Sequence, residues 1–124
     1  MIEFIYSPKN IEGKCAKRIS KGYPEILKNE GEFQIKVNGT LYFDEPNFSV
    51  DEFLLYAERW LTDKDKTKDM RYFSVDTDDN PLISFSVNND RWYVDSPWRL
   101  FECNDTFTRD ELEKAVSELK KSVG

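Results

Sequence analysis

The sequence predicts an α+β fold: an antiparallel sheet, made of a hairpin and a meander, with two capped amphipathic helices packed on one face. Three observations support this prediction. A helix-start motif occurs twice, an Asn-Gly pair separates two alternating segments, and apolar and polar residues alternate again after residue 70. The length of 124 residues, with 39% hydrophobic and 15% aromatic residues, fits one domain over residues 1–124 with a core built from large rings.

The first thirty residues show little periodic pattern. Met1–Tyr6 is expected to form a strand. The spacing of Ile11, Cys15 and Ile19 permits a short helix that ends at Gly22.

A hairpin is predicted next. Glu32–Val37 and Thr40–Asp44 have period-two alternation, and Asn38-Gly39 stands between them. Asn and Gly tolerate the positive φ angles that both positions of a type I′ turn require. The pair therefore predicts two antiparallel strands joined by a two-residue turn.

Two helices are predicted from the shared motif Phe-[Ser/Thr]-x-Asp-Glu-apolar, which begins at residues 48 and 107. In each, the hydroxyl is expected to cap the third helical N–H, and the glutamate to accept a hydrogen bond from the N–H of the cap residue. Because capping explains these carboxylates, none of them is assigned to catalysis. The helices are expected over Val50–Leu61 and Arg109–Ser122. The residues expected to face the core are Val50, Phe53, Leu54, Ala57, Trp60 and Leu61, then Leu112, Ala115, Val116, Leu119 and Val123.

The meander is predicted after a solvated loop of alternating charge at Asp63–Asp69. Arg71–Asp76 is expected to form a strand and Asp76–Pro81 a turn.

The last strands of the meander follow from a predicted turn at Asn88-Asn89. This turn places Trp92 on the same face as Phe85. Asp95-Ser96-Pro97 should end the strand, and Trp98–Cys103 is expected to form another.

Several site classes find no support in the sequence. There is no histidine, which removes most general-base, triad and zinc sites. Asp76, Asp78 and Asn80 have the alternation that opens a calcium loop, but Pro81 and Val87 replace its glycine and its final glutamate. We therefore expect no catalytic residues, no metal and no cofactor.

The chain is acidic, with 24 acidic and 18 basic residues and a net charge of −6. Residues 1–30 contain six basic and four acidic side chains, and the remaining residues contain twelve and twenty. A nucleic-acid binder needs a positive contact face, so no nucleic-acid partner is expected, although the basic first thirty residues could form a small positive patch. A basic protein partner fits better, because opposite potentials accelerate association.

The expected compartment is the cytoplasm. No apolar run approaches the roughly 20 residues needed to cross a bilayer, and the first residues do not resemble a secretory leader. Cys15 and Cys103 are accordingly expected to be free thiols, and no membrane partner is expected.

A partner-binding surface is predicted around the segment Asp90–Asp105 and the turn before it, where aromatic and charged side chains are interspersed. Protein interfaces use a few aromatic anchors surrounded by charge. The predicted binding residues are Asp76, Asp78, Asp79, Asp90, Asp95, Trp98 and Glu102. For Trp98, core packing and interface contact are both open.

Four segments resemble a family of small acidic Bacillus-type proteins, similar to immunity proteins of bacterial polymorphic-toxin and contact-dependent inhibition systems. They are Gly39-Thr-Leu-Tyr-Phe-Asp44-Glu45-Pro46, Glu52-Phe-Leu54 with Trp60, Asn80-Pro-Leu-Ile-Ser-Phe85 and Trp98-Arg-Leu-Phe-Glu102. The likeness covers residues 32–120. It implies a non-catalytic protein that neutralises a cognate, nuclease-like toxin by direct binding. A general interaction or regulatory module is the alternative, followed by a small enzyme or ligand-binding domain.

Overall fold

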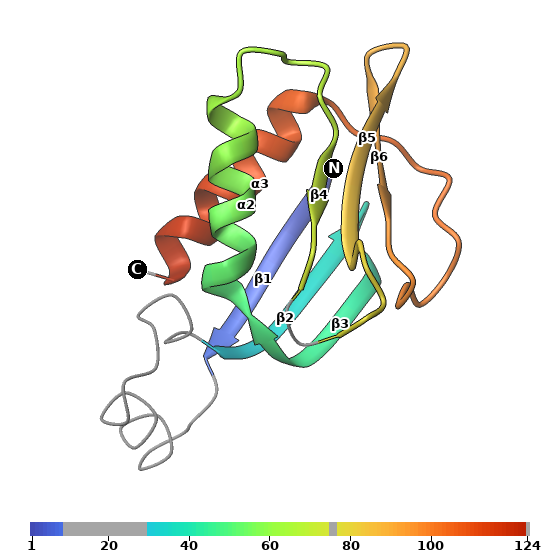
Figure 1. Cartoon of the computed structure of the whole chain (residues 1–124). Coiled ribbons are helices and arrows are strands. Elements are labelled where there is room, and N and C mark those ends of the chain that lie inside the picture. Colours follow the sequence, from blue (N-terminus) through green and yellow to red (C-terminus); the bar gives the residue numbers. More distant parts are fainter. Residues whose placement is uncertain (9–29, 75–76, 124) are drawn as a thin grey trace.

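The structure is a computed structural model that describes residues 1–8, 30–74 and 77–123. These residues fold into two three-stranded antiparallel sheets and two helices (Figure 1). The strands are β1 (Ile2–Pro8), β2 (Glu30–Val37), β3 (Thr40–Ser49), β4 (Met70–Tyr72), β5 (Ile83–Asn88) and β6 (Arg91–Asp95). The helices are α2 (Val50–Thr62) and α3 (Arg109–Val123). The short helix expected to end at Gly22 lies outside the described residues.

The sheet orders are β1-β2-β3 and β4-β5-β6. The predicted hairpin thus belongs to one sheet and the predicted meander forms the other, and the predicted α+β class is confirmed. The two helices lie next to each other on one side of the strands, with α3 against β1 and α2 against β4 and β2 (Figure 1).

Aromatic rings join these layers in the core. The ring of Phe4 in β1 lies 5.8 Å from Phe33 in β2, 5.6 Å from Phe53 in α2 and 5.8 Å from Phe85 in β5, between centroids. One ring therefore contacts both sheets and a helix. The stripes predicted for the helices supply most of the buried helical residues.

The two hairpin turns show one correct and one wrong prediction. Asn38 and Gly39 have φ angles of 50° and 81°, as predicted for the β2–β3 turn. The β5–β6 turn lies one residue later than predicted, at Asn89 and Asp90, whose φ angles are 51° and 65°. Both residue types tolerate this conformation. Moving the turn by one residue shifts the pairing between β5 and β6 by two residues. Because side chains alternate between the two faces of a sheet, a shift of two keeps each on its predicted face, and Trp92 still lies on the core side.

The two predicted capping boxes also differ. In α3, the N–H of Glu111 donates to Thr108 Oγ1 at 3.1 Å, and the N–H of Thr108 donates to Glu111 Oε1 at 3.0 Å. In α2, the Ser49 side chain makes no cap hydrogen bond, so the predicted hydroxyl cap was wrong. The carboxylate of Glu52 accepts a hydrogen bond of 2.6 Å from the Tyr72 hydroxyl in β4.

The predicted strand at Trp98–Cys103 does not form. Pro97 has no N–H, and the N–H groups of Trp98 and Arg99 bond back to Ser96, at its Oγ (3.1 Å) and its carbonyl (3.3 Å). The segment turns on itself instead of extending beside a strand.

Candidate functional site

The segment after β6 packs across the outer side of β3. The N–H of Leu100 donates to the Tyr42 carbonyl at 2.8 Å, and the ring of Phe101 lies edge-on to Tyr42 with 5.6 Å between centroids. The Tyr42 hydroxyl donates to the Val94 carbonyl at 3.4 Å. These contacts attach an irregular segment to a strand without a hydrogen-bonded ladder.

Tyr42 remains a neutral donor over the whole physiological range. Burial raises the pKa of Tyr42 to about 12, and the negative charge of Asp95 contributes to the increase. The phenol is therefore protonated wherever the protein is folded at neutral pH.

Trp98 joins this segment to the connection between β4 and β5. Its indole Nε1 donates to Asp79 Oδ2 at 2.8 Å. The ring is half-buried, packs against the core, and lines a hollow of about 190 Å³ together with Phe48 and Leu82. Trp98 is therefore a packing residue on one side and a surface residue on the other.

Two of the predicted carboxylates share one cation. Arg99 lies 3.5 Å from Asp95 and 3.6 Å from Glu102, and all three line an open hollow of about 260 Å³. Exposed ion pairs of this length contribute about 0–1 kcal/mol each, so they restrain Arg99 only weakly.

Leu100 is the residue that sequence reasoning missed. The residue is 57% exposed, the largest exposure among the large hydrophobic residues that the structure describes. The strand predicted over Trp98–Cys103 gave no reason to expect that Leu100 would be exposed. We call Asp79, Asp95, Trp98, Leu100 and Glu102 the Trp98 surface.

The remaining predicted binding residues do not join the Trp98 surface. Asp90 lies in the β5–β6 turn. The β4–β5 connection, which contains Asp79, lies at the other end of β5, whose six residues span roughly 16 Å at about 3.3 Å per residue. Asp78 is exposed in the β4–β5 connection, and Asp76 lies outside the described residues.

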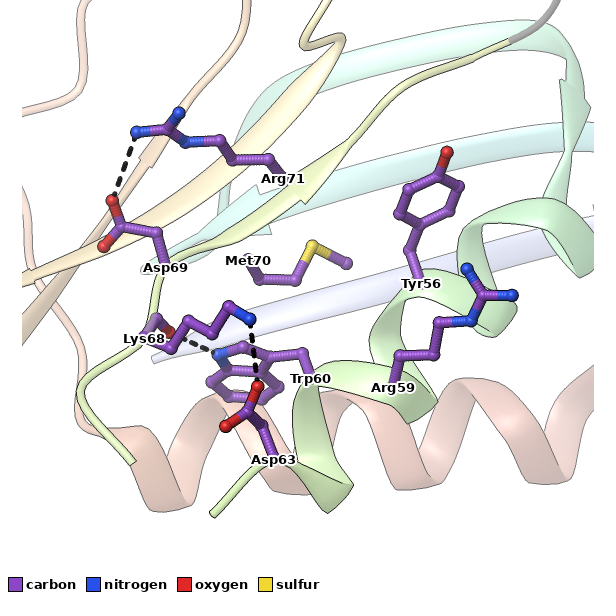
Figure 2. Close-up of a pocket in the computed structure, with 8 residues that line it drawn as sticks. All are labelled: Tyr56, Arg59, Trp60, Asp63, Lys68, Asp69, Met70 and Arg71. Atoms are coloured by element: carbon purple, nitrogen blue, oxygen red, sulfur yellow. Dashed lines mark hydrogen bonds and ion pairs between the residues drawn. The ribbon is translucent and has the colours of Figure 1, made fainter. Parts of the chain in front are cut away.

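A further hollow, of about 150 Å³, lies between α2 and β4 (Figure 2). It is lined by Tyr56, Arg59, Trp60, Asp63, Lys68, Asp69, Met70 and Arg71. The predicted loop Asp63–Asp69 forms one wall. Trp60 is buried as predicted, but its indole Nε1 also donates to the Lys68 carbonyl at 2.8 Å. No sequence pattern indicated this hollow, because its two sides come from different elements.

No group of three or more histidine, cysteine or acidic side chains in residues 1–8, 30–74 and 77–123 could hold a metal ion. In the same part of the chain, no helix is long and apolar enough to cross a bilayer.

These features define a small α+β protein that combines an acidic aromatic surface with a separate basic hollow. The chain matches, over residues 2–124, the family model described as "Domain of unknown function (DUF7878)", and it belongs to that family. Comparison with curated proteins and with solved structures gave no match. The likeness to immunity proteins therefore stays a prediction.

Proposed function

We propose that this protein binds a basic protein partner through the Trp98 surface, without making or breaking a covalent bond. In the form implied by the resemblance to immunity proteins, the partner is a nuclease-like toxin domain that the protein neutralises in the cytoplasm. A free thiol at Cys103 is compatible with that reducing compartment.

The exposure of Leu100 beside Trp98 is the observation that supports this proposal most strongly. Binding energy in protein interfaces comes from a few large side chains at the centre, while charges at the rim select the partner. The carboxylates of Asp95 and Glu102 both pair with Arg99, the residue that precedes Leu100 in the chain. This arrangement suits an apolar contact surrounded by lysine and arginine side chains of a partner.

The Trp98 surface is also held in place before any partner binds. The backbone of Leu100 is bonded to β3, and the indole of Trp98 is bonded to Asp79. Side chains that are already ordered lose less conformational entropy on binding, which favours affinity.

A regulatory module with another basic partner would use the same surface. Gene neighbourhood separates the two possibilities, because an immunity gene is expected next to its toxin gene.

The test is a calorimetric titration with the toxin domain encoded beside this gene. Glu102→Lys places a like charge against a basic partner, and we expect affinity to fall about tenfold or more. Glu118→Lys, an equal charge change at an exposed position of α3, is the matched control and should bind as the unsubstituted protein does. Equal affinities for the two variants would contradict the proposed surface.

A further inference from the structure

The hollow beside Trp98, which we call the Trp98 hollow, lies where segments that are distant in sequence meet. The end of β3 supplies Glu45 and Phe48, Ser74 follows β4, Leu82 precedes β5, and Trp98 follows β6. Its volume of about 190 Å³ exceeds the roughly 150 Å³ of a cavity that holds benzene. The Trp98 hollow is therefore large enough for one side chain of a partner.

Glu45 faces the Trp98 hollow because of its register in the sheet. It pairs with Phe33, which is fully buried, whereas the neighbouring Asp44 pairs with Gln34. Residues directly opposite each other on adjacent strands share one face of a sheet. The Glu45 side chain therefore lies on the core-facing side of β3, and it stays partly exposed because β3 is an edge strand.

The carboxylate of Glu45 is held beside the Trp98 hollow and has no counter-ion there. Its Oε1 accepts a hydrogen bond of 3.0 Å from the N–H of Asn47, which also lines the hollow. Among residues 1–8, 30–74 and 77–123, no lysine or arginine lines the hollow or pairs with Glu45. The charge of this lining is therefore negative, and it favours a cation.

Three large apolar side chains line the Trp98 hollow as well. Phe48 and Leu82 are buried, and Trp98 is half-buried. The indole of Trp98 is held in place by its hydrogen bond of 2.8 Å to Asp79, which brings a second carboxylate to the edge of the ring. A cation is attracted to the face of an indole, and an aliphatic stem packs well on apolar side chains.

These features favour arginine over lysine as the occupant. The guanidinium group is planar, stacks on aromatic rings and is more weakly hydrated than an ammonium group. It therefore loses less on entering a lining that is largely apolar. Arginine is also enriched among the few residues that supply most of the binding energy of protein interfaces.

We propose that the Trp98 hollow receives an arginine side chain of the basic partner. The aliphatic stem would lie on Phe48 and Leu82, and the guanidinium would lie against the indole of Trp98 and donate to Glu45. This inference rests on the proposed function, because the arginine belongs to the partner that the Trp98 surface binds. It adds Glu45, which lies outside the Trp98 surface, as the residue that selects the anchoring side chain.

NMR titration of the full chain with Nα-acetyl-arginine methylamide tests the proposal, with the citrulline and lysine analogues in parallel at matched ionic strength. Citrulline has the shape of arginine without its charge. We expect saturable shifts of the Trp98 indole N–H and of the amides of residues 45–49 and 82 with the arginine compound. The lysine compound should bind more weakly and the citrulline compound should cause no saturable shift.

The variant Glu45→Gln should weaken binding of the arginine compound about fivefold or more, because it removes the negative charge and keeps the shape of the side chain. Glu118→Gln, the same change at an exposed position of α3, is the matched control and should bind as the unsubstituted protein does. Four results would each overturn the proposal: no saturable shift with the arginine compound, equal binding of citrulline, equal or tighter binding of lysine, or full affinity in Glu45→Gln.

Failure of this proposal is distinguishable from failure of the proposed function. The titration needs no partner, so a negative result leaves the comparison of Glu102→Lys with Glu118→Lys as an independent test of the Trp98 surface. Equal affinities of those two variants for the toxin domain would contradict the Trp98 surface even if the capped arginine binds.

Discussion

The guanidinium of Arg109 stacks on the indole of Trp60, with its central carbon 4.1 Å from the ring centroid. The same group lies 5.7 Å from the ring of Trp92, pairs with Glu113 at 2.7 Å, and donates to the Lys66 carbonyl. One arginine at the start of α3 therefore joins α2, β6 and the loop between α2 and β4.

Arg109→Ala should destabilise the fold by about 1–3 kcal/mol, because it removes a partly buried cation–π contact and a charge-assisted hydrogen bond. Urea unfolding followed by circular dichroism measures the change. Arg91→Ala is the control. Within the part of the chain that the structure describes, that exposed side chain makes one hydrogen bond, to Thr106, so its loss should cost less than about 0.5 kcal/mol. Equal losses for the two variants would contradict the role of Arg109.

The hydrogen bond between Trp98 and Asp79 should stabilise the Trp98 surface measurably. Trp98→Phe keeps an aromatic ring and removes the indole N–H, and Asp79→Ala removes the acceptor. In a double-mutant cycle on the free energy of unfolding we expect a coupling of about 0.5–1.5 kcal/mol. A coupling near zero would show that the two side chains are independent.

The cap of α3 predicts both a stability loss and a pH dependence. Thr108→Ala should cost about 1 kcal/mol, whereas Ser117→Ala, at an exposed position within the same helix, should be neutral or slightly stabilising. Hydrogen bonding from the Thr108 N–H lowers the pKa of Glu111 in the folded state. The stability from this carboxylate is therefore present above the pKa of an unfolded glutamate and is lost as pH falls through the lowered folded pKa.

Glu111→Gln isolates that pH dependence. The variant should be less stable than the unsubstituted protein at about pH 7, and the gap should close as pH falls through the lowered folded pKa of Glu111, below which both proteins carry a neutral side chain. Urea midpoints across this range measure it. A gap that is constant with pH would mean that ionisation of Glu111 does not contribute.

The opposite sign is expected for Glu32 in β2. Repulsion from Asp44 raises the pKa of Glu32 in the folded state. Ionisation of Glu32 therefore destabilises the fold as pH rises through the pKa of an unfolded glutamate. Asp44→Asn should therefore stabilise the protein near neutral pH, and the gain should disappear in acid. Thermal unfolding at the two pH values tests this, and a gain that persists in acid would point to a cause other than charge.

Local chemistry explains which parts of the fold were predictable. Asn38-Gly39 has few alternatives to a tight turn, and Thr108 with Glu111 forms its cap from neighbouring residues alone. Ser49 with Glu52 has the same motif, but the Ser49 hydroxyl does not cap the helix, and Tyr72, twenty residues away from Glu52, donates a hydrogen bond to the carboxylate. That hydrogen bond is a tertiary contact that no local pattern contains.

The candidate site was predictable only in part for the same reason. Trp98 and the carboxylates near it were found from composition, because aromatic and charged residues cluster in sequence there. The bond from Trp98 to Asp79 and the exposure of Leu100 depend on how an irregular segment crosses β3. The hollow between α2 and β4 depends on side chains that come from separate elements, such as Tyr56 of α2 and Met70 of β4.

Leu100→Asp, titrated calorimetrically against the toxin domain encoded beside this gene, tests the proposed binding surface most directly. Leu55→Asp is the matched control, because Leu55 is also exposed, at 37%, but lies on α2 away from the Trp98 surface. We predict about a thirtyfold or greater loss of affinity for Leu100→Asp, as for a central contact residue, and no change for Leu55→Asp. Full affinity in Leu100→Asp, with the fold intact, would contradict partner binding through the Trp98 surface.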